Sequence, residues 1–288
     1  MALTLDVVQT AIAETDAGWT AAETSVSRYA AAPAGDVNLF GLNIGDEQAE
    51  EQLAEARALE TAEFHVVAPP PPAHEWRNVG GRNFVTSIKN QQTCGSCVAF
   101  AVCAALESRV AIQQDEADPR LDLSEAHLFY CGCGRCCRTG WNFAPALNWA
   151  RNGIGRETSF PYVPRDQVCP APPPPAVVNV PSWISVASPT ARKQAIVASG
   201  PVIGGLRVYE DFYYYRAGVY RHVTGSFRGL HAICVIGYDD AQQCWIIKNS
   251  WGTGWGEQGF MRIAYGQCDL DSTYPFYDPT VVAAGGIV

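Results

Sequence analysis

The chain has 288 residues, of which 48% are apolar, so it can bury a core of ordinary size and is neither disordered nor fibrous. No apolar run approaches the roughly 18 residues that span a bilayer, and the first twenty residues lack the basic start and apolar stretch of a secretion signal. We therefore expect no membrane partner.

The net charge of −9 is concentrated at the front of the chain. Residues 1–70 hold twelve acidic residues against only Arg28 and Arg57, which leaves the remainder near +1. An acidic front on a nearly neutral body argues against nucleic-acid binding and suggests that the front is a separate functional unit. The alternative is that acidic helices simply present solvated faces here.

The front of the chain predicts short helices. Residues 5–29 read as one or two amphipathic helices that bury Val8, Ile12, Trp19 and Val26. After a short apolar segment at 37–44, Asp46 can cap a helix that runs to about Ala62. The four prolines at 69–72 favour an extended connector, so we expect the main boundary there, between a unit of residues 1–70 and a domain of residues 71–288.

The larger domain changes from helical to strand-like patterns along its length. Helices are predicted to start near Cys97, at 124–130 with Ser124 as cap, and near 144–151. Short apolar segments rich in β-branched and aromatic residues follow, and they read as strands at 201–208, 232–238, 244–248 and 259–263. This order predicts an α+β architecture with a cleft between two lobes.

The same domain contains the groups that nucleophilic thiol catalysis needs. Cys97 stands at a predicted helix start, where the helix dipole lowers a thiol pKa. Gln91 lies six residues earlier, and its side-chain amide can donate a hydrogen bond to an oxyanion. His231 opens an apolar strand 134 residues after Cys97, and Asn249 follows the next strand. A thiol, a base, a group that orients the base and an oxyanion donor are therefore all available.

These motifs resemble those of the papain family of cysteine peptidases, over about three quarters of the chain. The likeness begins at Glu75-Trp76-Arg77, which is similar to the family's mature N-terminus, continues through the segments 159–162 and 200–202, and ends in the Asn-Ser-Trp-Gly motif at 249–252. The resemblance implies a helical lobe and an antiparallel, β-barrel-like lobe with the active site between them. It also implies that the mainly helical residues 1–70 are an inhibitory prosegment.

The resemblance assigns a role to each catalytic candidate. Cys97 would attack the scissile carbonyl as one half of an ion pair with His231, and Asn249 would fix the orientation of the imidazole. Gln91 and the Cys97 N–H would form the oxyanion hole, while Trp251 would shield the contact between His231 and Asn249.

The resemblance also implies which residues bind substrate: Gly140, Trp141, Asn142, Gly205, Leu230 and Ala232. Small Gly205 and Ala232 predict a roomy, apolar pocket for Leu, Phe or Tyr two residues before the cut. Asp271 near its base would instead allow Arg, and this alternative stays open. The chain departs from the family at Val98, where a tryptophan is usual, and at Leu230, which makes the leaving-group side more apolar.

Eleven cysteines indicate disulfide bonds and a secreted or otherwise oxidising location. The resemblance implies bonds from Cys94 to Cys137 and from Cys131 to Cys169, whereas Cys268 lacks its usual partner. Cys133 and Cys136 are additional, and a zinc knuckle that they form with Cys131 and Cys137 is an alternative. The pair Cys94 and Cys97 could alone be a redox or zinc motif. Buried, inert thiols are expected at Cys103, Cys234 and Cys244.

The leading function is that of an endopeptidase for protein or peptide substrates, without metal or cofactor and as a monomer. Ligation or transpeptidation by the same acyl-enzyme, and a silent binding protein of the same fold, are the alternatives. Residues 40–46 resemble the short strand motif of family propeptides. We expect the prosegment to cross the cleft in the reverse of the substrate direction with residues 59–67, and to be released at acid pH when carboxylates paired with arginines are protonated.

Overall fold

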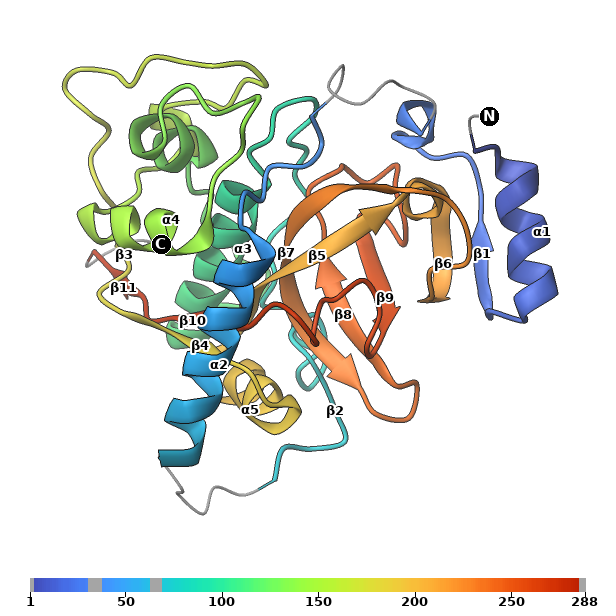
Figure 1. Ribbon diagram of the computed structural model, residues 1–288. Helices are drawn as coiled ribbons and strands as arrows, with labels where there is room; N and C mark the ends of the chain where they lie inside the picture. Colours follow the sequence, from blue (N-terminus) through green and yellow to red (C-terminus); the bar gives the residue numbers. More distant parts are fainter. Residues whose placement is uncertain (1–2, 31–37, 63–68, 285–288) are drawn as a thin grey trace.

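The computed structural model describes residues 3–30, 38–62 and 69–284. One side of the molecule is built around helices and the other around a curved sheet (Figure 1). The helices within residues 71–288 are α3 (Cys97–Gln113), α4 (Phe143–Trp149) and α5 (Pro189–Ser199), with short helical turns at His127–Cys131, Ala150–Asn152, Glu157–Ser159 and Glu210–Tyr214. This agrees with the expected α+β fold of two lobes.

Within the described residues, nine strands form one sheet with the order β1-β6-β9-β8-β7-β5-β10-β4, and β2 pairs with β7. All of its pairs are antiparallel except that of β6 with β9. The strands are β1 (Trp19–Ala21), β2 (Ala73–Glu75), β4 (Trp183–Val186), β5 (Val202–Tyr209), β6 (Tyr215–Tyr220), β7 (Phe227–Asp239), β8 (Cys244–Lys248), β9 (Phe260–Ala264) and β10 (Phe276–Pro279). A separate pair joins β3 (Val178–Asn179) to β11 (Val282–Ala283).

Helix α3 is the central contact between the two lobes. Its residues are buried on every side from Cys97 to Ala111, and it packs against β7 as well as α4 and β5. Small side chains such as Ala101, Ala104 and Ala105 allow this close approach on all faces. The packing places the first turn of α3, which carries Cys97, against the strand that carries His231.

The acidic front of the chain lies on both sides of this body. Helix α1 (Leu5–Thr15) packs beside β1 at the edge of the sheet, while α2 (Asp46–Ala62) packs against β4 on the other side (Figure 1). The bounds of α2 are those that the sequence predicted. Residues 38–44 lie before α2 and contact both lobes, as described below.

The prediction of one or two helices over residues 5–29 was wrong for residues 16–26, and a single 3-10 turn forms at Ser27–Tyr29. Asp16 (φ 48°) and Gly18 (φ 73°) adopt left-handed conformations that end α1, and the chain then turns into β1. Trp19 is buried as predicted, but in a strand, where its ring packs against Tyr215 and Tyr220. Tertiary pairing with β6 therefore determines the structure of this segment.

Candidate active site

Cys97 is the first residue of α3, and its thiol is completely buried. Its sulfur accepts hydrogen bonds from the Ala232 N–H at 3.4 Å and from the Gly41 N–H at 3.2 Å. Ala232 belongs to β7, whereas Gly41 belongs to the front unit of the chain. The residues 38–42, which we call the crossing segment, therefore lie directly on the sulfur.

His231 on β7 and Asn249 after β8 form the second part of the site. The imidazole Nε2 lies 2.8 Å from Asn249 Oδ1, and the same oxygen accepts from the Ser250 N–H at 2.7 Å. Because that oxygen can only accept, Nε2 carries the proton and Nδ1 is left as the free base. Nδ1 is buried without a hydrogen-bond partner among the described residues. The Trp251 ring, 5.0 Å from the imidazole, covers the pair.

Burial keeps both reactive groups neutral in this closed form. It raises the pKa of Cys97 to about 11, although the N–H groups of Ala232 and Gly41 oppose the change. It lowers the pKa of His231 to about 4, against the opposing effect of Asn249 and of the Leu39 backbone. The expected thiolate-imidazolium ion pair is therefore disfavoured here, because neither charge is solvated.

Hydrogen bonds hold the amide of Gln91, the predicted oxyanion donor, and its N–H group donates to the crossing segment. Ser250 Oγ donates to Gln91 Oε1 at 2.6 Å, which leaves Nε2 to donate to the carbonyl oxygens of Leu39 (3.2 Å) and Cys94 (3.0 Å). The Tyr162 hydroxyl donates to the Gln91 backbone carbonyl at 2.8 Å. The sequence patterns identified Gln91 but neither Ser250 nor Tyr162 as its support.

The crossing segment continues along the wall formed by residues 140–142. The Trp141 N–H donates to the Gly41 carbonyl at 2.6 Å, the Asn43 N–H donates to the Trp141 carbonyl at 2.8 Å, and Leu42 pairs with Trp141 in parallel. A Cβ on Gly41 would overlap the carbonyl of Gly95, and one on Gly140 would overlap the carbonyl of Gly41. Only glycines allow the three backbones to lie this close.

The prediction that residues 59–67 cross the cleft was wrong for residues 59–62, the described part of that range. Residues 38–42 lie on Cys97 and Gln91 instead, and Leu59 lies in α2 with 62% of its surface exposed. Residues 63–67 are outside the described part of the chain. The physical reason is that the Asp46 helix follows the crossing segment and packs on β4, beyond the cleft.

The Leu42 side chain fills the pocket expected from Gly205. A Cβ on Gly205 would lie 2.6 Å from Leu42 Cδ2 and close to Phe143 and Tyr274, so Gly205 leaves the room that Leu42 uses. Leu230 contributes its carbonyl, which accepts from the Leu42 N–H at 3.3 Å. Asn142 lies at the outer rim, where its amide donates to Gln48 of α2 at 3.1 Å.

Asp271, the acid proposed for the base of this pocket, has other partners. Its carboxylate accepts from Trp245 Nε1 at 2.9 Å and from the Gly266 N–H at 2.9 and 3.1 Å. A carboxylate that is engaged in this way gives no basis for accepting an arginine in the pocket.

The cysteines form three disulfide bonds: Cys94–Cys137, Cys131–Cys169 and Cys133–Cys136. The first two are the pairs that the resemblance implied. The zinc alternative is wrong because all four of its cysteines are in disulfide bonds, and the redox alternative for Cys94 and Cys97 is wrong because Cys94 is bonded elsewhere. The thiols of Cys97, Cys103, Cys234, Cys244 and Cys268 are free and buried.

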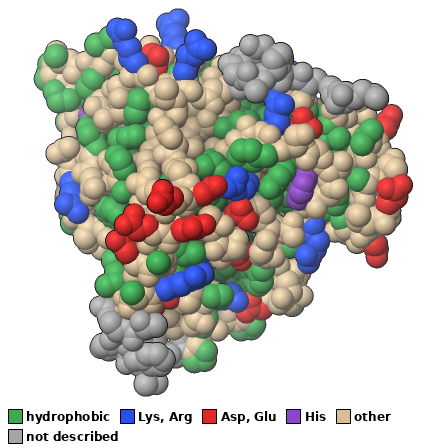
Figure 2. All heavy atoms as spheres, in the orientation of Figure 1, with side chains coloured by type: hydrophobic (Ala, Val, Ile, Leu, Met, Phe, Trp, Pro, Cys, Tyr) green, Lys and Arg blue, Asp and Glu red, His purple; other side chains and the backbone are tan. Residues whose placement is uncertain are grey.

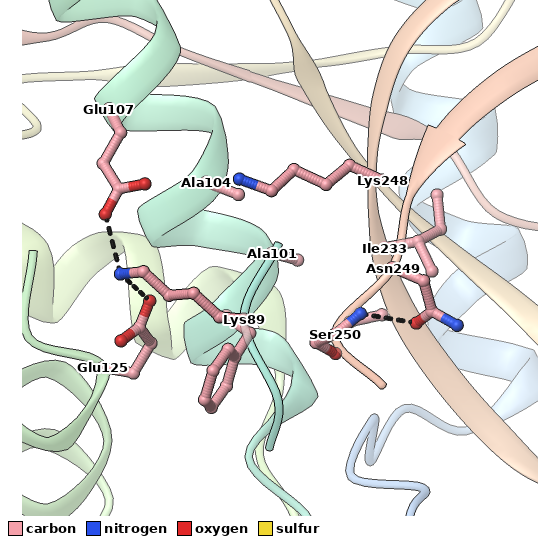
Figure 3. Close-up of a pocket in the computed structure, with 11 residues that line it drawn as sticks. Lys89, Ala101, Ala104, Glu107, Glu125, Ile233, Lys248, Asn249 and Ser250 are labelled. Atoms are coloured by element: carbon pink, nitrogen blue, oxygen red, sulfur yellow. Dashed lines mark hydrogen bonds and ion pairs between the residues drawn. The ribbon is translucent and has the colours of Figure 1, made fainter. Parts of the chain in front are cut away.

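A cluster of buried charges lies behind Asn249, at the junction of the lobes (Figure 3). Lys89 Nζ bonds Glu107 at 2.9 Å and Glu125 at 2.7 Å, and Lys248 Nζ donates to Thr86 Oγ1 at 2.8 Å. Burial would lower the pKa of Lys89, but these carboxylates outweigh it and raise the pKa. Lys248 directly precedes Asn249, so the cluster anchors that loop; isolated lysines and glutamates in the sequence gave no signal for it.

Within residues 3–30, 38–62 and 69–284, no helix is long and apolar enough to cross a membrane.

Comparison with known proteins adds a family to this geometry. Residues 70–276 match the model of the papain family cysteine proteases. Over 226 residues the chain is 34% identical to cysteine proteinase 1 of Entamoeba histolytica, covering 74% of this chain and 69% of that protein. It is also 34% identical to pro-cathepsin H of Mus musculus, covering 74% of this chain and 66% of that protein.

Solved structures agree with the fold. Procathepsin B S9 from Trypanosoma congolense superposes with a TM-score of 0.77 at 22% identity, covering 98% of this chain and 99% of that chain. The bromelain protease of Ananas comosus in complex with the E64 inhibitor gives a TM-score of 0.61 at 29% identity, and covers 73% of this chain and 99% of that chain.

Proposed function

Because this chain belongs to the papain family of cysteine proteases, we propose that it is an endopeptidase whose catalytic groups are Cys97, His231, Asn249 and Gln91. One observation carries the proposal. The Leu39 carbonyl oxygen lies 3.2 Å from Gln91 Nε2, beside a sulfur that accepts two N–H groups. A carbonyl group already occupies the place where a scissile carbonyl would react.

In the proposed reaction, the Cys97 thiol gives its proton to His231 Nδ1 and the sulfur attacks the scissile carbonyl carbon. The oxyanion that forms accepts from Gln91 Nε2 and the Cys97 N–H. When the carbon–nitrogen bond breaks, His231 protonates the leaving amine, and a thioester remains on Cys97. Water then attacks the thioester carbon and gives a proton to His231. The carbon–sulfur bond breaks, the carboxylic acid product leaves, and His231 returns the proton to the sulfur. Asn249 holds the imidazole throughout.

We also propose that residues 1–70 are a prosegment that keeps the enzyme latent. The crossing segment places the Leu42 side chain in the Gly205 pocket and the Leu39 carbonyl on the Gln91 amide. The Gly41 N–H donates to the Cys97 sulfur. The family resemblance implies that a substrate runs in the opposite direction, so the segment would occupy the site without being aligned for cleavage. The three disulfide bonds support secretion or another oxidising location.

The test of the site uses a peptide-like epoxide, which alkylates an activated active-site thiol. The protein is incubated at pH 7 and at pH 4, and cleavage is followed by gel electrophoresis and N-terminal sequencing beside the Cys97→Ala variant. We expect cleavage of the wild type alone between residues 60 and 75, activity on a fluorogenic peptide, and one adduct at Cys97. Full activity of the uncut chain at pH 7 would contradict the proposal that residues 1–70 keep the enzyme latent. An adduct at another cysteine would contradict the assignment of Cys97 as the nucleophile.

A further inference from the structure

Arg207 of β5 holds Asp46, a carboxylate of the proposed prosegment, at the rim of the substrate pocket. Its NH2 group lies 2.6 Å from Asp46 Oδ1, and the Tyr274 hydroxyl lies 3.5 Å from the same oxygen. Asp46 is the first residue of α2, whose exposed acidic side chains gather on the face shown in Figure 2.

Contacts within residues 71–288 hold the Arg207 guanidinium so that one edge faces Asp46. Arg207 Nε bonds Asp269 Oδ2 at 2.7 Å, and the guanidinium carbon lies 5.2 Å from the centre of the Phe227 ring. The Arg207 backbone N–H donates to the Cys268 carbonyl at 2.8 Å. One edge of the guanidinium is therefore held by its own domain, while the other edge is turned to Asp46.

Arg207 is placed beside the pocket, not in it. Side chains two residues apart on a strand share a face, so Arg207 lies on the same face of β5 as Gly205, against which Leu42 packs. In the sheet, Arg207 pairs with Leu230, whose carbonyl accepts the Leu42 N–H. The guanidinium therefore binds a carboxylate, Asp46, four residues after the Leu42 that fills the pocket.

We propose that Arg207 is a specificity determinant that selects substrates with an acidic side chain within four residues of the bulky apolar residue in the pocket. This inference rests on the proposed peptidase function. When Asp46 leaves with the prosegment, the free edge of Arg207 can donate to a new carboxylate in the geometry that Asp46 now uses. Asp46 thereby acts as a stand-in for the acidic side chain of a substrate.

The test measures kcat/KM of the processed enzyme on fluorogenic peptides that carry Leu for the pocket and either Asp or Asn at each position up to four residues away from it. Asn has the shape of Asp without its charge. Since the pair is partly exposed, with 23% of the Arg207 side chain and 58% of the Asp46 side chain accessible, we expect Asp to be favoured about two- to fivefold at one of these positions. The preference should shrink as ionic strength rises.

Three variants assign the effect. Arg207→Gln should bring the Asp/Asn ratio to about one, Arg207→Lys should keep part of it, and Arg216→Gln on β6 should keep all of it. Equal cleavage of the Asp and Asn peptides by the wild type would overturn the role of Arg207 and leave the peptidase function intact. If neither peptide is cleaved by the processed enzyme, the proposed function falls as well.

Discussion

Burial of the Cys97 thiol determines how the intact chain should react with an alkylating reagent. A pKa of about 11 leaves only about one thiol in ten thousand ionised at pH 7. We expect iodoacetamide to modify Cys97 at least about a hundredfold more slowly in the intact chain than after processing, as measured by mass spectrometry over time. The Cys97→Ala variant reports any labelling of the other thiols. Equal rates in the two forms would show that the segment does not shield the sulfur.

Ser250 is a positioning residue that the sequence patterns did not reveal. Its hydroxyl fixes the Gln91 amide, and its N–H binds Asn249 Oδ1. Ser250→Ala should therefore lower kcat about tenfold with little change in KM, because the amide is less well aligned with the oxyanion. Exposed Ser272 provides the control, Ser272→Ala. A loss confined to KM, or an equal loss in both variants, would contradict this role.

Among the elements, the crossing segment depends on the absence of a side chain at Gly41. A Cβ there would overlap the Gly95 carbonyl, whereas nothing lies within 4 Å of a Cβ at Gly45. Gly41→Ala should displace the segment, so the uncut chain should hydrolyse a small fluorogenic peptide, while Gly45→Ala should stay latent. Both variants are assayed before any cleavage is visible on a gel. Latency of the uncut Gly41→Ala chain would contradict the argument.

Elements with strong local signals were predictable from the sequence. Asp46 begins α2, Cys97 begins α3, and residues 244–248 form β8 as the patterns indicated. Helix α5 was missed, although Ser188 and Pro189 carry the usual capping signal. The strand at Trp19 could not be predicted, since its structure comes from pairing with β6, about 200 residues away. Local pattern does not report such distant pairing.

The site shows the same division between local and distant information. Cys97, His231 and Asn249 lie in recognisable motifs, and the structure brings them together around the sulfur and the imidazole. The sequence placed residues 59–67 in the cleft instead of residues 38–42, because backbone contacts with Gly95, Gly140 and Trp141 set the path of the crossing segment and these contacts depend on the folded wall. Charge partners such as Arg207 for Asp46 also appear only in the folded chain.

For the whole molecule, we expect protonation of His231 to weaken the closed form at acid pH more than protonation of the acidic side chains of residues 1–70. The sequence predicted an acid response from carboxylates paired with arginines of the body, but Asp46–Arg207 is the one such pair that joins the front to the body within the described residues. The pKa of His231 is about 4 when covered, against about 6.5 in water. We expect the closed form to be fully stable above pH 6.5 and to lose stability as the pH falls toward 4; the loss reaches about 3 kcal/mol when opening exposes the imidazole fully to water.

Hydrogen exchange at residues 38–44 measures this opening, after correction for the intrinsic pH dependence of exchange. In the Cys97→Ala background, which cannot cut itself, we expect exchange to accelerate between pH 6.5 and 4. The double variant Cys97→Ala/His231→Gln should show no such rise, because it lacks the titrating imidazole. The same rise in both proteins would place the acid response on other groups.

Strand β1 separates cutting of the chain from activation. It joins the edge of the sheet through the pairs Trp19–Gly218 and Thr20–Ala217, and the Tyr214 hydroxyl donates to the Leu3 carbonyl at 2.9 Å. A cut between residues 60 and 75 would leave these bonds unchanged, so its first product would be a two-chain complex in which the front piece is still attached. We expect activity to appear at the rate of dissociation and to rise on dilution, because recapture of the released piece is bimolecular. A cell that stores this protein at high concentration would hold it inactive even after the chain has been cut.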